Sequence, residues 1–183
     1  MTLAIEFNIE DETWAVATPW YREVALRAAE QALAVAGMAG REAEISVLLC
    51  DDKRIAELNG GFRGKAASTN VLSWPAHQLA PSAPGEPPPA PPSGFLGDIA
   101  FARETIATEA RAQQLSMERH FAHLFAHGVF HLLGYDHETD ADALLMEGLE
   151  RRALGAMGIS DPYAAEREAA ADARGGNGDD ERR

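Results

Sequence analysis

The stretch MERHFAHLFAHGVFHLLGYDH, residues 117–137, predicts a long helix, the residue at which it ends and a row of histidines along one of its faces. On a helix that advances about 100° per residue, four histidines fall within one narrow stripe; they are His120, His123, His127 and His131. Apolar side chains occupy the neighbouring faces and supply the packing; they are Met117, Phe121, Leu124, Phe125, Val129 and Leu132. Gly134 can adopt a left-handed conformation that ends the helix and turns the chain back.

Three histidines of this stretch have the spacing of a catalytic metal site. His127 and His131 can present two imidazoles to one ion, and the turn after Gly134 would bring His137 round as a third ligand. A pair of histidines alone would more often be packed or solvated, but the glycine and the third histidine favour a metal. Neutral nitrogen ligands suit zinc, and also nickel, copper or iron. Three protein ligands leave a fourth position open, which is typical of a catalytic ion.

The pattern H-x-x-x-H-x-x-G-x-x-H is also the zinc spacing of a protease class, with one difference. In that class a glutamate after the first histidine carries the proton to the leaving amine, whereas Gly128 stands here. Amide hydrolysis needs that acid, while a phosphodiester can be cleaved with a metal and a cation on its oxygens. The motif therefore indicates phosphate esters as substrates. His120 and His123 are expected to line the pocket or to support the ligands.

Hydrophobic periodicity elsewhere predicts a single small sheet with helices around it. Strands are expected over residues 3–9, 43–50, 70–74 and 95–102, and helices over residues 19–37, 51–62, 102–114, 117–133 and 139–154. Core candidates in the first helix are Val24, Leu26, Leu33 and Val35. Because strands and helices do not alternate strictly, the expected fold class is α+β, with about five helices.

The length of 183 residues favours one domain, expected over residues 1–160. Eight of the ten prolines lie between Pro75 and Pro92, so residues 76–94 are expected to form a proline-rich loop insertion. A stiff surface insertion is favoured over a ligand for a partner domain. Residues 161–183 are poor in apolar side chains and are expected to form a disordered acidic tail.

We expect a cytoplasmic protein. The N-terminal residues lack a signal peptide, no apolar run approaches a membrane span, and the single cysteine, Cys50, is expected to be a buried reduced thiol in a strand. The net charge of −13 argues against broad binding to nucleic acid, and no DNA substrate is expected. From Leu58 to Gly85, however, the chain has no acidic residue and carries Arg63 and Lys65, which would suit a local anion site.

Three segments together resemble the YbeY family of bacterial ribosomal-RNA maturation endoribonucleases. They are ELNGGFRGKAASTNVLSWP (residues 57–75), LGDIAFA (96–102) and HGVFHLLGYDH (127–137). The resemblance implies an α+β fold with a small mixed four-stranded sheet and a metal site at the end of a long helix. It also implies a zinc-dependent endoribonuclease specific for single-stranded RNA. Its implied partners are ribosomal RNA and components of the small ribosomal subunit, in maturation and ribosome quality control.

By the same resemblance, His127, His131 and His137 hold the metal and Arg63 is the catalytic residue. The residues alone agree on Arg63, because it follows a glycine pair expected to end a helix, and a guanidinium on an exposed loop can bind two phosphate oxygens at once. Asp136 is expected to orient a ligand histidine or to cap the turn. The nucleophile stays open between metal-activated water and the RNA's own 2′-hydroxyl.

Two other functions stay open from the sequence. A noncatalytic ribosome-assembly factor with a structural metal is favoured by the net charge of −13, which suits binding to basic ribosomal proteins. A metal-dependent peptidase-like hydrolase is favoured by the histidine spacing and disfavoured by Gly128.

Overall fold

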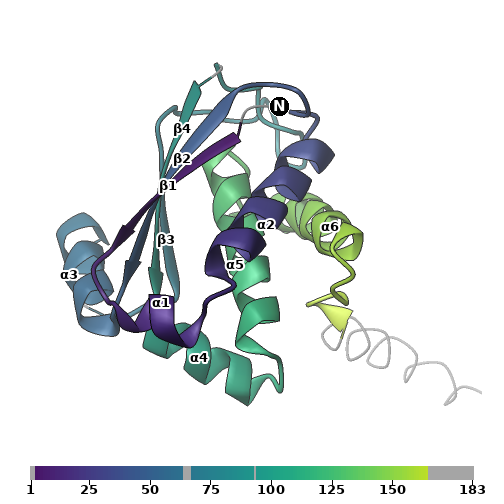
Figure 1. Ribbon diagram of the computed structural model, residues 1–183. Helices are drawn as coiled ribbons and strands as arrows, with labels where there is room; N and C mark the ends of the chain where they lie inside the picture. Colours follow the sequence, from purple (N-terminus) through teal and green to yellow (C-terminus); the bar gives the residue numbers. More distant parts are fainter. Residues whose placement is uncertain (1–2, 64–66, 93, 165–183) are drawn as a thin grey trace, which may run out of the picture.

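Four strands form one mixed sheet in the order β1-β2-β4-β3 (Figure 1). The computed structural model describes residues 3–63, 67–92 and 94–164, apart from the side chains of residues 61–63. The strands are β1 (Leu3–Ile9), β2 (Ala43–Cys50), β3 (Val71–Pro75) and β4 (Gly94–Ala102). β1 and β4 both pair with β2 in parallel, and β3 pairs with β4 antiparallel. The predicted α+β class and mixed four-stranded sheet are therefore confirmed.

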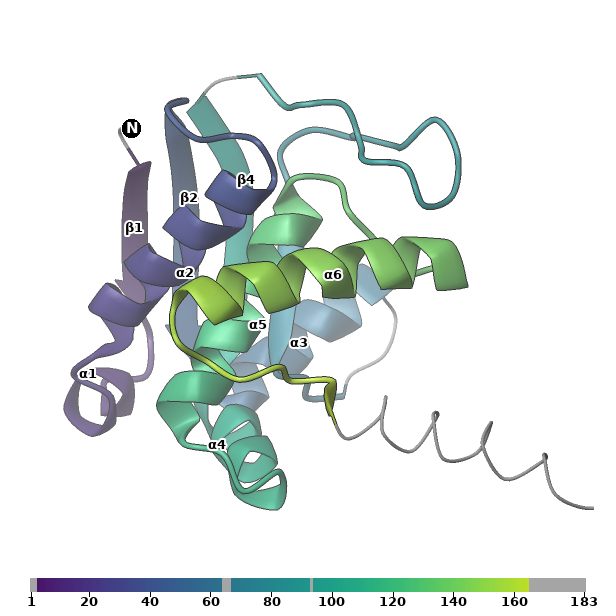
Figure 2. The ribbon, with the colours of Figure 1, turned by 90° about the vertical axis from the view of Figure 1, so that its right-hand side faces the viewer.

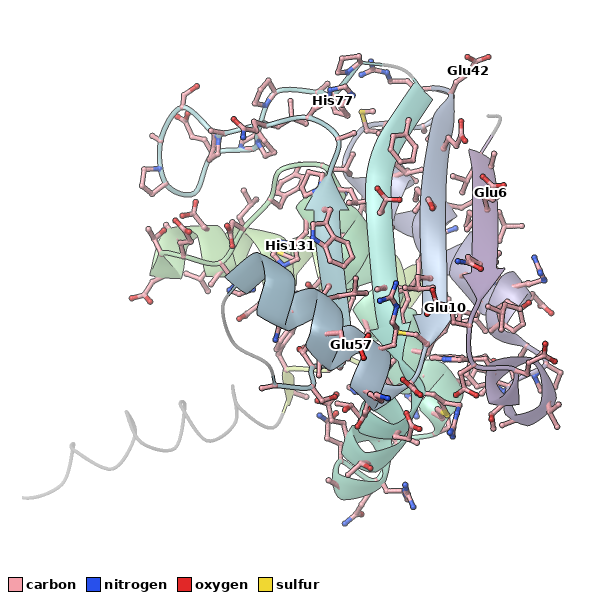
Figure 3. All side chains as sticks on the ribbon, turned by 90° about the vertical axis from the view of Figure 1, so that its left-hand side faces the viewer. Glu6, Glu10, Glu42, Glu57, His77 and His131 are labelled. Atoms are coloured by element: carbon pink, nitrogen blue, oxygen red, sulfur yellow. The ribbon has the colours of Figure 1, made fainter. Side chains whose placement is uncertain are left out.

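The described residues contain six helices, of which five were predicted. They are α1 (Thr13–Ala17), α2 (Tyr21–Val35), α3 (Asp52–Arg63), α4 (Arg103–Ala112), α5 (Met117–Leu132) and α6 (Asp140–Ala156). Helices α2, α5 and α6 lie on one side of the sheet (Figures 1 and 2), and α3 lies on the other, across the end of an otherwise open face (Figure 3). None of the helices in the described part of the chain has the length and hydropathy needed to cross a bilayer.

Helix α5 is held against the sheet by aromatic packing. Phe121 and Phe125, both fully buried, contact Phe101 of β4 with ring centroids 5.0 and 5.4 Å away, and Phe125 stacks on it. The unpredicted helix α1 contributes Trp14, which is buried and donates a hydrogen bond from Nε1 to the Cys50 carbonyl at 3.0 Å. Cys50 itself is buried in β2, as predicted. This packing fixes the direction in which the histidine stripe faces.

Two details of the predicted elements are wrong. Leu26 is 40% exposed, because it lies outside the buried stripe of α2. That stripe consists mainly of alanines, which let the helix approach the core closely. Val24 and Leu33 are buried as predicted, and Val35 packs at the margin of the core. Helix α3 continues through its glycine pair to Arg63, so the backbone of Arg63 belongs to a last helical turn and not to a loop.

The proline-rich segment is described from residue 76 to residue 92. It has no helix or strand of its own and is fastened to the first turn of α6, because the Gly85 amide donates to Asp142 Oδ1 at 2.8 Å. Arg41 donates to the Pro91 carbonyl at 2.7 Å near the other end. Lys65 and most of the predicted acidic tail lie outside the described residues.

Candidate metal centre

Local sequence sets both ends of helix α5. At the start, Ser116 Oγ accepts a hydrogen bond from the Arg119 amide at 3.2 Å, which satisfies one free amide of the first turn. At the end, Gly134 has φ +87°, as predicted, and the Tyr135 amide donates to the Phe130 carbonyl at 3.0 Å. A Cβ on Gly134 would lie 2.5 Å from the Leu79 carbonyl oxygen. The chain thus turns back over α5 and brings His137 beside the helix.

The three predicted metal ligands lie together. One ring nitrogen from each of His127, His131 and His137 lies within 4.8 Å of the other two. The Nε2 atoms of His127 and His131 are 2.9 Å apart. The ring centroid of His137 lies 5.6 Å from that of His127 and 5.2 Å from that of His131.

The hydrogen bonds around these rings leave the facing nitrogens without protons. His127 Nδ1 lies 2.8 Å from Glu150 Oε1, and His131 Nδ1 lies 3.0 Å from the Tyr135 carbonyl oxygen. A carboxylate and a carbonyl only accept, so each Nδ1 carries the hydrogen and each Nε2 of a neutral ring is a bare lone pair. Two lone pairs at 2.9 Å repel unless a cation lies between them. The donor set therefore fits a metal ion.

Burial and neighbouring charge keep His131 in the form that binds a metal. Burial, followed by the nearby rings of His127 and His137, lowers the pKa of His131 to about 4. The ring is therefore neutral at physiological pH, and its Nε2 is available as a ligand atom.

Glu150 is a functional residue that the sequence did not reveal. Its side chain is 1% exposed on α6 and accepts from His127 through Oε1 and from His123 through Oε2, at 2.8 and 3.0 Å. Burial would raise the pKa of Glu150, but the hydrogen bonds from His123 and His127 outweigh it and the pKa is lowered to about 2. Glu150 is thus a carboxylate that fixes the tautomer and orientation of His127.

Replacement of Glu150 by glutamine is expected to weaken zinc binding by roughly 10-fold or more, within the 10–100-fold range usual for such partners. The amide can still accept from His127 but no longer supplies the negative charge that makes the ligand ring more basic. Zinc affinity measured by competition with a chromophoric chelator tests this. Glu147→Gln, one turn away on the same helix, should leave the affinity unchanged, and equal affinities for both variants would contradict the role of Glu150.

The histidines lie at the wall of a cleft of about 910 Å³. Its other walls come from β3, from the start of the proline-rich segment and from the turn at Gly134 to Glu138. Figure 3 labels His77 and His131, which both line this cleft. The three histidines therefore share one cleft with β3 and the start of the proline-rich segment.

Gly128, where the protease class has its glutamate, faces the sheet. A Cβ there would lie 3.0 Å from Ile99 Cδ1 and 3.3 Å from Ser73 Oγ. The glycine lets α5 lie close against β3 and β4. A glutamate at this position would therefore enter the packed layer between helix and sheet.

The remaining residues that the sequence singled out do not belong to the group of three histidines. His120 and His123 do not join the metal triad: their Nε2 atoms lie 2.8 Å from Glu109 and 3.0 Å from Glu150. Asp136 accepts from the His137 amide at 2.7 Å, which fits the predicted role in the turn. The Arg63 side chain lies outside the described residues.

Fold and site together define a class: small α+β proteins in which three histidines, clustered at the end of a long helix, can hold a metal ion. The family model described as "Endoribonuclease YbeY" matches residues 6–158. The chain belongs to the YbeY family.

Similar proteins cover almost the whole chain. A protein of Ruegeria pomeroyi named "Endoribonuclease YbeY" is 47% identical over 169 residues, which are 90% of this chain and 100% of that protein. A protein of the same name from Dinoroseobacter shibae is 44% identical over 164 residues, 87% of this chain and 90% of that protein. A solution structure from Thermotoga maritima shares the fold with a TM-score of 0.51 at 19% identity, over 88% of this chain and 98% of that one.

Proposed function

We propose that this protein is a metal-dependent endoribonuclease that cuts single-stranded RNA in the maturation of small-subunit ribosomal RNA and in ribosome quality control. The observation that carries the proposal is the pair of bare Nε2 atoms, 2.9 Å apart at the wall of a cleft, in a chain of the YbeY family. The ligands would be His127, His131 and His137, and the ion would be zinc, although nickel or another divalent metal would also suit these nitrogens.

When bound, the ion would supply Lewis-acid polarisation of the scissile phosphodiester and would make nearby water more acidic. The protein supplies the arrangement around it. Glu150 and the Tyr135 carbonyl hold the Nδ1 hydrogens of His127 and His131, so that both Nε2 lone pairs face the cleft. The cleft and the short run of acid-free sequence that includes Arg63 would hold the RNA backbone.

Arg63 is the proposed catalytic residue, and Arg63→Ala is expected to lower the cleavage rate by about 100-fold or more, as removal of one donor to a developing charge does elsewhere. The guanidinium would bind two oxygens of the phosphate as negative charge builds up on it. Cleavage of a labelled single-stranded RNA by the two proteins at equal zinc measures the effect.

The matched control for Arg63 is Arg54, an arginine on the same helix. Arg54 is exposed and pairs with Glu10 and Glu57 at 2.9 and 3.4 Å, so its loss should change neither the rate nor the fold measurably. Equal cleavage rates of wild type and Arg63→Ala would show that Arg63 is not needed for cleavage. The product ends identify the nucleophile: a 5′-phosphate indicates water, and a cyclic or 3′-phosphate indicates the 2′-hydroxyl.

A noncatalytic ribosome-assembly factor is the second candidate, and the net charge of −13 favours it because it suits contact with basic ribosomal proteins. An Arg63→Ala variant that binds small subunits and restores rRNA maturation as well as wild type would support this candidate. A peptidase is disfavoured because Gly128 has no room for the acid that amide hydrolysis needs. The work would take place in the cytoplasm.

A further inference from the structure

A second cavity, of about 570 Å³, lies between α4, the first half of α5 and the segment that follows α6. Its polar wall includes Asn70, Glu109, Gln113, Arg119, His120 and His123 from α4, α5 and the residues that border α4 and β3, with Ser160, Asp161 and Tyr163 from the segment after α6. Leucines from α5 and α6 supply apolar surface. We propose that this cavity, here called the base pocket, binds a guanine base of the RNA substrate. The proposal rests on the function proposed above and names a specificity site for it.

Glu109 gives the base pocket an oriented hydrogen-bond acceptor. Its Oε2 accepts from Asn70 Nδ2 at 2.9 Å and lies 2.8 Å from His120 Nε2, while its Oε1 has the Asn70 amide at 3.2 Å. The two oxygens together offer about four lone-pair positions. Asn70 and His120 take both positions of Oε2 and Asn70 takes one of Oε1, so one position on Oε1 is left. With a third of its side-chain surface exposed, Glu109 can reach a ligand in the cavity.

His120 is held in place at a cost to stability. Its side chain is 4% exposed, and because Glu109 can only accept, Nε2 carries the hydrogen and Nδ1 is a bare acceptor. That buried Nδ1 has no hydrogen-bond partner in the part of the chain that the structure describes. A buried acceptor without a partner is destabilising. A phenylalanine would pack without this cost, so the imidazole indicates that the orientation of Glu109 matters.

Among the four RNA bases, guanine matches this wall best. Its Watson–Crick edge has two adjacent donors, N1–H and the N2 amine, and an acceptor, O6, beyond them. The free position of Glu109 Oε1 would accept one donor, and the amide oxygen of Gln113, four residues further along, would accept the other. Arg119 has five N–H donors, of which one is bonded to Ser160 at 2.5 Å, and Gln113 adds an amide. Uracil has one donor between two carbonyls, and cytosine and adenine have a bare nitrogen beside their amine, so none of the three offers two adjacent donors to Glu109 and Gln113.

The base pocket is connected to the metal centre. Asn70 lines both the base pocket and the metal cleft. His123 and Tyr163, also on the wall of the base pocket, hydrogen-bond Oε2 of Glu150, whose Oε1 holds His127. An unpaired guanine in the pocket would therefore lie next to the side chains that position a metal ligand, and the RNA backbone would continue into the cleft.

Binding of nucleoside monophosphates to the full chain tests the base pocket without RNA cleavage. Isothermal titration calorimetry in the presence of chelator, with GMP, AMP, CMP and UMP, is expected to show GMP binding about tenfold tighter than the others. Glu109→Gln should remove this preference, because its one amide oxygen would be taken by Asn70 and His120 and an N–H donor would stand where Oε1 accepted. Gln113→Ala, at an exposed position of the wall, should weaken the binding of GMP several-fold. Glu118→Gln, an exposed acid outside the wall, is the matched control and should bind like wild type.

Cleavage of single-stranded RNAs that differ in one guanosine gives the second readout. Wild type should cut at a fixed distance from the guanosine, and Glu109→Gln should cut with zinc but without this preference. Equal binding of the four nucleotides, or a GMP preference unchanged in Glu109→Gln and Gln113→Ala, would overturn the base pocket. If GMP binding depends on Glu109 but the protein cuts no RNA, the base pocket is supported and the proposed nuclease activity is contradicted. If the protein cuts RNA with metal but without any preference for guanosine, the nuclease activity is supported and the base pocket is contradicted.

Discussion

His131→Ala is expected to abolish stoichiometric zinc binding and, with it, RNA cleavage. The variant removes one of the two facing Nε2 atoms, so that only His127 and His137 remain of the three proposed ligands. Equilibrium dialysis followed by metal analysis should give one zinc per wild-type chain and none per variant chain. RNA cleavage should fall to background in the same preparation.

Thermal unfolding separates loss of the metal from loss of the fold. Without metal, His131→Ala gives up the hydrogen bond to the Tyr135 carbonyl, about 1 kcal/mol, but also relieves the repulsion between two lone pairs. Both apo proteins should therefore unfold at similar temperatures. Zinc at 100 times its dissociation constant should stabilise wild type by about 2.7 kcal/mol and the variant not at all.

His77→Ala is the matched control for His131→Ala, since His77 lines the same cleft but is not part of the triad. It should keep one zinc per chain and the full zinc-dependent rise in unfolding temperature. Full zinc binding by His131→Ala would show that the ion lies elsewhere.

Gly128→Glu is expected to unfold the protein and not to create a peptidase. The new side chain would enter the layer between α5 and the sheet, where a Cβ alone already lies 3.0 Å from Ile99. Overpacking costs about 1–3 kcal/mol, and an unpaired carboxylate in a buried layer adds at least about 2 kcal/mol more. Against a total stability of about 5–15 kcal/mol, the soluble folded fraction measured by circular dichroism and gel filtration should fall sharply.

Gly128→Ala shows whether the carboxylate or any side chain is responsible. Alanine favours the helix by about 1 kcal/mol over glycine, while its Cβ pushes on Ile99 and Ser73. The two effects oppose each other, so the free energy of unfolding of this variant should lie within about 1 kcal/mol of the wild-type value. A Gly128→Glu protein that is as stable as wild type and cleaves a peptide with zinc would contradict the placement of residue 128 against the sheet.

The sequence predicted the elements whose periodicity is local. The four strands, five of the six helices and the end of α5 at Gly134 are confirmed, because each depends on residues close in the chain. The spacing of three histidines predicted a cluster that the fold does bring together. Helix α1 escaped prediction because it has only five residues, and its anchor is a single tryptophan, Trp14, that bonds to distant Cys50.

The surroundings of the histidines could not be predicted, since they depend on how α4 and α6 pack against α5. Glu109 and Glu150 reach α5 from these two helices, so no spacing in the sequence links them to their partners. One signal was present for Glu150: it lies in the buried stripe of α6 beside Leu149 and Leu154, where a charged side chain needs a partner.

The most direct test of a metal-dependent nuclease is cleavage of a labelled single-stranded RNA by the purified protein as zinc is removed and returned. Wild type should cut, stop cutting in chelator and recover when zinc is restored, whereas His131→Ala should cut under none of these conditions. Cleavage that persists in chelator, or that His131→Ala performs as well as wild type, would contradict an active site built on His127, His131 and His137.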